Sequence, residues 1–215
     1  MFREHFAETV ERKTLIQADF HIHTVYSSDS VIQPKMLVER LLAHSFVKVA
    51  AVTDHDSVRG CRATVELASA FPDILVIPGV EISTQHGDMV ILGTEELPPR
   101  PWTPEVIVDY AKAIGGVSIV AHPYREYGMG DLARNYKVDA IEVLNGGSTQ
   151  AANNQAKELA KSMGLPGTAG SDAHQLSELF SVYTKVEASL TVDDILGAIR
   201  KGSVSAQVAR GSIHF

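Results

Sequence analysis

Two histidines stand two positions apart at the end of the first apolar run of the chain, residues 16–21. Strand side chains alternate between the faces of a sheet, so His21 and His23 would point the same way. Two imidazoles on one face at a strand end can bind one metal ion, although a pair of this kind also occurs as an ordinary polar strand end. Asp29 follows in a serine-rich loop and is a further candidate ligand.

A second polar cluster, Asp54-His55-Asp56, follows the apolar run 47–53. Three ionisable groups in succession repel or desolvate one another unless a cation is bound. His55 is therefore a candidate ligand. Either Asp54 or Asp56 could orient its ring, and an aspartate-rich turn before a helix is the competing interpretation.

A single carboxylate interrupts the apolar run 74–82. Glu81 in such a strand costs several kcal/mol unless it is paired or bound to a metal. A carboxylate that bridges two metals is the natural role here, and the alternative is an outward-facing glutamate on an edge strand.

Two later clusters repeat the pattern. His122 follows the run 117–121, with Arg125 three residues on, and Asp172 and His174 repeat the spacing of the first pair. A guanidinium there could hold a phosphate oxygen bidentately, and a surface charge is the competing interpretation. Glu142 and Asn145, at the end of the run 140–144, either line the pocket or support the ligands.

The elements that must position these residues are short apolar runs alternating with segments of helical length. The predicted strands are 16–21, 47–53, 74–82, 89–92, 117–121, 140–144 and 182–186. The predicted helices are 34–46, 59–71, 104–115, 149–163 and 191–202. Alternation of this kind favours a parallel sheet with crossover helices, as a closed barrel or an open sheet, and both place sites at the carboxyl ends of strands. The polar clusters follow the runs, as this arrangement requires.

Composition narrows the class of protein. The chain has 215 residues, a formal net charge of −7 and one cysteine, so neither internal disulfides nor a cysteine zinc site is expected. The acidity argues against non-specific binding of duplex DNA. No apolar run is long enough to span a membrane, and the first 15 residues lack a signal-peptide core, so we expect a cytoplasmic protein.

The motifs FHIHTVYSSDS, VTDHDSVRG, PGVEIST, AHPYR and GSDAH together resemble the PHP (polymerase and histidinol phosphatase) family of metal-dependent phosphoesterases. The resemblance implies an α/β fold, a distorted (β/α)7 TIM-like barrel with its metal site at the carboxyl-terminal rim of the strands. We expect an N-terminal extension over 1–15 and one catalytic domain over 16–215.

The resemblance also implies two or three divalent ions, with zinc, manganese and iron all compatible. Its ligand sets are His21, His23, Glu81 and Asp172 for one metal, Asp29, His55 and His174 for a second, and Glu81 with His122 for a third. The family often has another histidine after the PGVEIS-type motif. Here Asp88 aligns with it and His86 lies two residues earlier, so either could be the ligand, and Asp88 is our candidate.

The predicted activity is hydrolysis of a phosphomonoester or phosphodiester by a metal-activated hydroxide. The substrate would be a small phosphorylated metabolite, a nucleotide or a nucleic-acid end. Arg125 and Asp54 are the candidate catalytic residues, and the general acid is not assigned. The alternatives are an amidohydrolase-type metal hydrolase and a metal-binding regulatory module without catalysis.

Overall fold

The computed structural model describes residues 14–209. Its elements in chain order are β1 (Thr14–Ile22), α1 (Pro34–Ala43), β2 (Val47–Val52), α2 (Arg59–Ala68), β3 (Leu75–Thr84), β4 (Gly87–Leu92), α3 (Pro104–Ala113), β5 (Val117–Val120), the 3₁₀ helix η1 (Gly130–Asn135), β6 (Ala140–Asn145), α4 (Gln150–Met163), β7 (Gly167–Gly170), β8 (Val182–Ala188), α5 (Val192–Arg200) and β9 (Val204–Val208). Most of the predicted N-terminal extension, 1–15, lies outside the described residues, but Thr14 and Leu15 already belong to β1.

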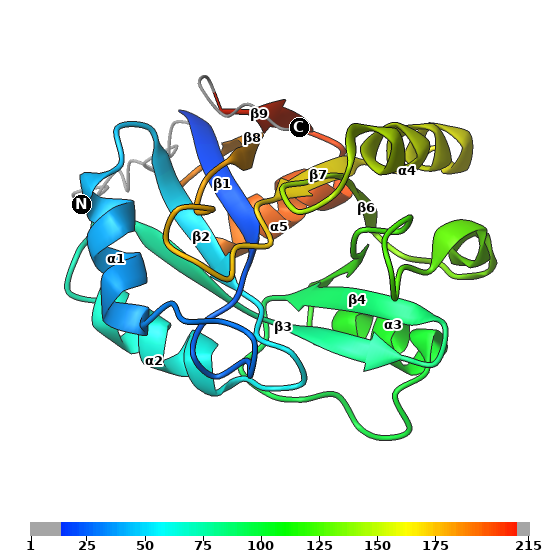
Figure 1. Cartoon of the computed structure of the whole chain (residues 1–215), viewed down its shortest axis with the longest axis horizontal. Helices are drawn as coiled ribbons and strands as arrows, with labels where there is room; N and C mark the ends of the chain where they lie inside the picture. The colour runs from blue at the N-terminus through cyan, green and yellow to red at the C-terminus, as the bar shows by residue number, and fades with distance from the viewer. Residues whose placement is uncertain (1–13, 210–215) are drawn as a thin grey trace, which may run out of the picture.

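One sheet in the order β7-β6-β5-β4-β3-β2-β1-β8-β9 forms the centre of the molecule. Helices α1 and α2 lie on one side of it and α4 on the opposite side (Figure 1). The segment after β7 returns to β1, where the N–H of Asp172 donates to the carbonyl of His21 at 2.7 Å and Ile22 bridges Ala173 in parallel. The sheet is therefore nearly closed, and the predicted distorted barrel is confirmed.

Apolar side chains cover both faces of the strands, as the uninterrupted apolar runs suggest. Ile16 and Phe20 of β1 belong to a core cluster with Ile195 and Ile199 of α5. A larger cluster packs the other strand faces against α1, α2, α3 and α4. None of the helices in the described part of the chain has the length and apolar character needed to cross a bilayer.

All seven predicted strands are present, but two of them run antiparallel to their neighbours. β4 forms a hairpin with β3, and β8 pairs antiparallel with β1. The reason for the hairpin is that only Gln85 and His86 separate β3 from β4, whereas a parallel crossover needs about a dozen residues. β7 and β9 were not expected. The sequence of β7, Gly-Thr-Ala-Gly, lacks the β-branched run that would predict it.

The five predicted helices are present, and local hydrogen bonds fix their starts. Thr103 and Thr191 each accept a backbone N–H of the first turn, as their positions predict. Gly164 ends α4 in the left-handed conformation, with φ of 66°.

Two glycines at which a larger side chain would fit, Gly164 and Gly197, allow a test of how backbone conformation affects stability. A Cβ at Gly197, inside α5, or at Gly164 would meet no atom within 4 Å. Gly197→Ala should raise the free energy of unfolding by about 0.5–1 kcal/mol because alanine favours the helix. Gly164→Ala should lower it by ~1 kcal/mol because of the positive φ. Denaturant unfolding of both variants checks the opposite signs, and equal signs would contradict the backbone explanation.

Candidate metal centre

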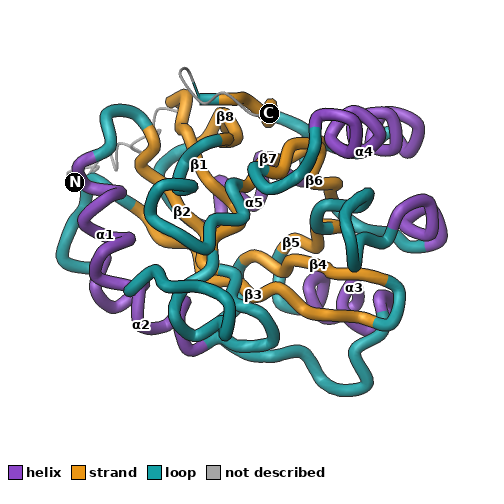
Figure 2. The backbone as a smooth tube through the Cα atoms, viewed as in Figure 1, coloured by secondary structure: helices purple, strands orange, loops and turns teal. Residues whose placement is uncertain are grey.

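The candidate ligands come together at one rim of the barrel. They are contributed by the ends of β1 and β3, by the loops after β1, β2, β5 and β7, and by the start of β4. The loops that follow β1, β2 and β7 meet near the centre of the view in Figure 2. Eight of the nine predicted ligands lie within one network of short His–carboxylate contacts: His21, His23, Asp29, His55, Glu81, His122, Asp172 and His174.

Four buried donor atoms form the tightest part of the network. Nε2 of His21 lies 3.1 Å from Nε2 of His23 and 3.2 Å from Oε2 of Glu81. Oδ1 of Asp172 lies 3.5 Å from Nε2 of His21 and 3.1 Å from Nε2 of His23. Ligands about 2.0–2.1 Å from a tetrahedral zinc ion would be about 3.4 Å from one another. The spacing therefore fits a small divalent cation.

The proton positions explain why this group fits a cation. Nδ1 of His21 faces Oε1 of Glu142 at 3.0 Å and must carry a proton to bond to it. Nδ1 of His23 faces Oγ of Ser27 at 3.1 Å, and that hydroxyl donates in turn to Asp54. The neutral imidazoles therefore turn unprotonated Nε2 atoms toward two carboxylates, an arrangement that a cation stabilises.

Protons take the place of a cation when no metal is bound. Burial alone would lower the pKa of His23, but hydrogen bonds to Asp172 and Glu81 outweigh it and raise the pKa to about 9. Burial alone would raise the pKa of Glu81, but the charge of His21 and the bonds to the imidazoles hold it well below its usual value. The site thus stabilises positive charge among its donors.

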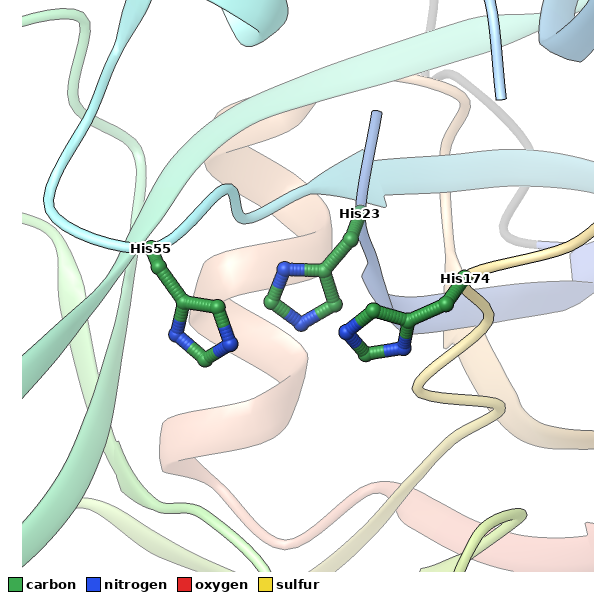
Figure 3. A group of neighbouring side chains, drawn as sticks. All are labelled: His23, His55 and His174. Atoms are coloured by element: carbon green, nitrogen blue, oxygen red, sulfur yellow. The ribbon is translucent and has the colours of Figure 1, made fainter. Parts of the chain in front are cut away.

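A second group lies at the edge of the first. It consists of the imidazole rings of His23, His55 and His174, which lie side by side (Figure 3). The ring centroid of His23 lies 4.4 Å from that of His55 and 4.3 Å from that of His174. His174 donates Nδ1–H to the carbonyl of Asp172 at 2.8 Å, which leaves Nε2 free to coordinate. Oδ2 of Asp29 lies 3.2 Å from that nitrogen. This group matches the second predicted ligand set, with His23 added.

A third group consists of His21, Glu81 and His122, and Glu81 connects it to the other two. One of its oxygens contacts His21, His23 and His55, and the other lies 3.0 Å from Nε2 of His122. Nδ1 of His122 is buried and has no hydrogen-bond partner in the described part of the chain. His122 also has φ of 23°, a conformation that bulky residues rarely adopt away from functional sites. The arrangement suits a bridging carboxylate with His122 on a further cation.

The ninth predicted ligand, Asp88, lies beside the ligand groups but is not a member of any of them. It is 5% exposed and lines the same cavity, but the three ligand groups among the described residues do not include it. Burial, followed by the charge of Glu81, raises the pKa of its carboxyl group. Nδ1 of its alternative, His86, is bonded to Tyr136. Neither residue is tied to a ligand group.

The two candidate catalytic residues differ in their positions. Arg125 lines the cavity, where Nη1 contacts the carboxylate of Asp172 and lies 3.1 Å from Oδ1 of Asn145. Asp54 is fully buried and accepts hydrogen bonds from the backbone N–H and hydroxyl of Thr24 and from Ser27. The Ser27 hydroxyl also contacts Nδ1 of His23, so it links Asp54 to a candidate ligand, and the catalytic role of Asp54 stays a prediction.

Sequence reasoning left Glu142 and Asn145 open and missed Ser27. Glu142 bonds His21 through one oxygen and the backbone N–H of His122 through the other, so it supports two ligands. Asn145 joins Glu142 to Asp172. A carboxylate inside an apolar strand was the available signal for Glu142, but a serine in a polar loop carries no such signal.

Removal of the Ser27 hydroxyl should weaken metal binding. Ser27→Ala leaves Nδ1 of His23 and the Asp54 carboxylate without their common partner, and the loss of such supports lowers metal affinity roughly 10–100-fold. Competition with a chromophoric chelator measures the change. Ser28→Ala, at the exposed neighbour, is the matched control, and equal affinities of the two variants would contradict the role of Ser27.

Comparisons with known proteins agree with this architecture. A family model named PHP_C, described as PHP-associated, matches residues 150–204. An uncharacterised protein of Methanocaldococcus jannaschii is 32% identical over 142 residues, which cover 60% of this chain and 82% of the relative.

Three solved structures are similar in fold at low sequence identity. An amidohydrolase from Chromobacterium violaceum has a TM-score of 0.62 and 18% identity, over 75% of this chain and 88% of that one. A proposed metal-dependent phosphoesterase from Bifidobacterium adolescentis has a TM-score of 0.59 and 16% identity, over 73% and 87%. Endonuclease Q, solved with a duplex containing an abasic lesion, has a TM-score of 0.60 and 15% identity, over 91% and 58%.

Proposed function

This chain belongs to the PHP domain family, and on that premise we propose that it is a metal-dependent phosphoesterase. The observation that carries the proposal is the buried carboxylate of Glu81, which contacts four imidazoles beside a cavity of about 1050 Å³. Two or three divalent cations held there by the nine candidate ligands would supply a nucleophile from water at neutral pH and neutralise charge on a phosphoryl group.

The residues of the chain have separable tasks in this proposal. The imidazoles and carboxylates of the rim bind the cations, and Glu142 and Ser27 orient His21 and His23. Arg125 lies on the cavity wall, where its guanidinium can bind phosphate oxygens in place of Asn145 and Asp172. The substrate is a phosphomonoester or phosphodiester.

Substitution of Arg125 tests its task. Arg125→Ala should lower kcat/KM for a phosphate ester about 10²-fold, since a charged donor to the transferred group is removed. Metal content should be unchanged because Arg125 offers no ligand atom. Arg134→Ala, which removes an exposed guanidinium bonded to Asp131, is the control. Loss of metal together with activity would contradict the assignment.

Hydrolysis assays distinguish this function from the alternatives. Protein loaded with zinc, manganese or iron should release p-nitrophenol from p-nitrophenyl phosphate or its bis ester, and leave a lactone intact. The reverse preference would favour an amidohydrolase-type enzyme, and the described residues that line the cavity include no lysine of the kind such enzymes often carbamylate. Tight metal binding without hydrolysis of any phosphate ester would favour a regulatory module.

A further inference from the structure

The cavity extends beyond the candidate ligands. Its wall also includes Thr84, Gln85 and His86 at the tip of the β3–β4 hairpin, and residues 126–128 of the loop after β5. The cavity volume, about 1050 Å³, lies at the upper end of the range for small-molecule sites, roughly 300–1,000 Å³. A phosphate group alone would leave most of that space empty, so the wall has room for the rest of a substrate.

His86 is held in this wall by a residue behind it. Nδ1 of its half-buried ring bonds to Oη of Tyr136, which follows η1 and is not part of the wall. The backbone N–H of His86 donates to Oγ1 of Thr84 at 3.2 Å, which fixes the turn. Nε2 of His86 has no hydrogen-bond partner in the part of the chain that the structure describes. The ring is therefore held in place with one polar atom unused.

Tyr127, on the loop after β5, is another residue of the same wall and carries an aromatic ring. The side chain is 75% exposed, and its backbone has φ of 63°, an unusual conformation for a bulky residue. The carbonyl of Tyr127 accepts the N–H of Asp88 at 3.0 Å, so the loop is tied to the start of β4. An exposed ring on a loop that is tied down beside a cavity can stack on a planar group of a ligand.

We propose that this outer wall is the binding site for the alcohol portion of the substrate, and that it selects a nucleoside phosphate. A nucleobase has the planar face that Tyr127 can stack on and the polar edge that Nε2 of His86 can bond to. Tyr136 is a positioning residue because it acts through His86. The inference rests on the proposed phosphoesterase function and specifies its substrate class.

Steady-state kinetics of Tyr136→Phe test the proposal with two esters, adenosine 5′-monophosphate and glycerol 3-phosphate. Loss of one orienting hydrogen bond should raise KM for the nucleotide roughly three- to tenfold and leave kcat unchanged. Both constants for glycerol 3-phosphate should stay as in the wild type. Tyr124→Phe is the matched control, since its hydroxyl bonds to Asp131 and its side chain lies outside the cavity wall.

His86→Asn and Tyr127→Ala should show the same selective rise in KM for the nucleotide. A 5′-phosphorylated hexanucleotide distinguishes nucleic-acid ends from free nucleotides as the substrate. If the variants also have a raised KM for the hexanucleotide, the site binds strand ends. If KM rises for the mononucleotide alone, the site binds free nucleotides. Equal changes for both small esters, or no change in any variant, would overturn the subsite while the phosphoesterase function stands. Wild-type protein that hydrolyses no phosphate ester would instead refute the proposed function.

Discussion

Glu81→Gln should remove most bound metal and lower kcat/KM at least about a hundredfold. Loss of a residue that only supports a metal ligand lowers metal affinity or activity by up to about a hundredfold, and loss of a ligand itself should cost at least as much. The substitution keeps the size of the side chain but replaces a charge that contacts His21, His23, His55 and His122. An amide nitrogen would also face unprotonated imidazoles or a cation. The loss should therefore affect all three ligand groups together.

Elemental analysis after dialysis, combined with the rate of p-nitrophenyl phosphate hydrolysis, measures both effects. Glu187→Gln is the matched control because Glu187 is exposed on β8. Circular dichroism should show that both variants are folded. A Glu81→Gln protein with its full metal content would contradict the bridging role.

The rim could be predicted because fold geometry, not local structure, brings its residues together. Parallel strands end at one edge, so residues at the ends of β1 and β3, or just after β2 and β5, must lie near one another. Only residue type and position along each strand were needed for His21, His55, Glu81 and His122. Their convergence therefore follows from the alternation of strands and helices.

Other features depend on contacts that residue types do not reveal. Asp54 and His55 are neighbours in sequence, yet one carboxylate is buried against Thr24 while the adjacent ring reaches the cavity. Which of them faces the site depends on how the loop after β1 packs against β2. The closing strand β7 is equally hard to predict, since its small residues are required by close packing: a Cβ at Gly170 would lie 2.2 Å from Cβ of His21.

The second large effect concerns stability, which should depend on pH in opposite ways with and without metal. In metal-free protein the pKa of His23 is raised from 6.5 to about 9. A raised folded-state pKa contributes stability that is fully present below pH 6.5 and lost as the pH rises through 9. The contribution is about 3 kcal/mol. The melting temperature of chelated protein should therefore fall by roughly 5–10 °C between pH 7 and 9.5.

Metal-loaded protein should not lose stability over that interval, because the cation competes with protons for the same Nε2 atoms and binds more tightly as they deprotonate. Differential scanning calorimetry of paired samples, with chelator and with excess zinc, measures the two slopes. Burial raises the pKa of Asp19 to about 7, so this group titrates mainly below the interval from pH 7 to 9.5. It titrates in the chelated and in the metal-loaded sample alike, so it does not cause the difference between their slopes. Parallel slopes would mean that protons and metal do not share a site. Divergent slopes would tie the stability of the fold to cation binding at the imidazoles of the rim, His21, His23 and His122, independently of any catalytic assay.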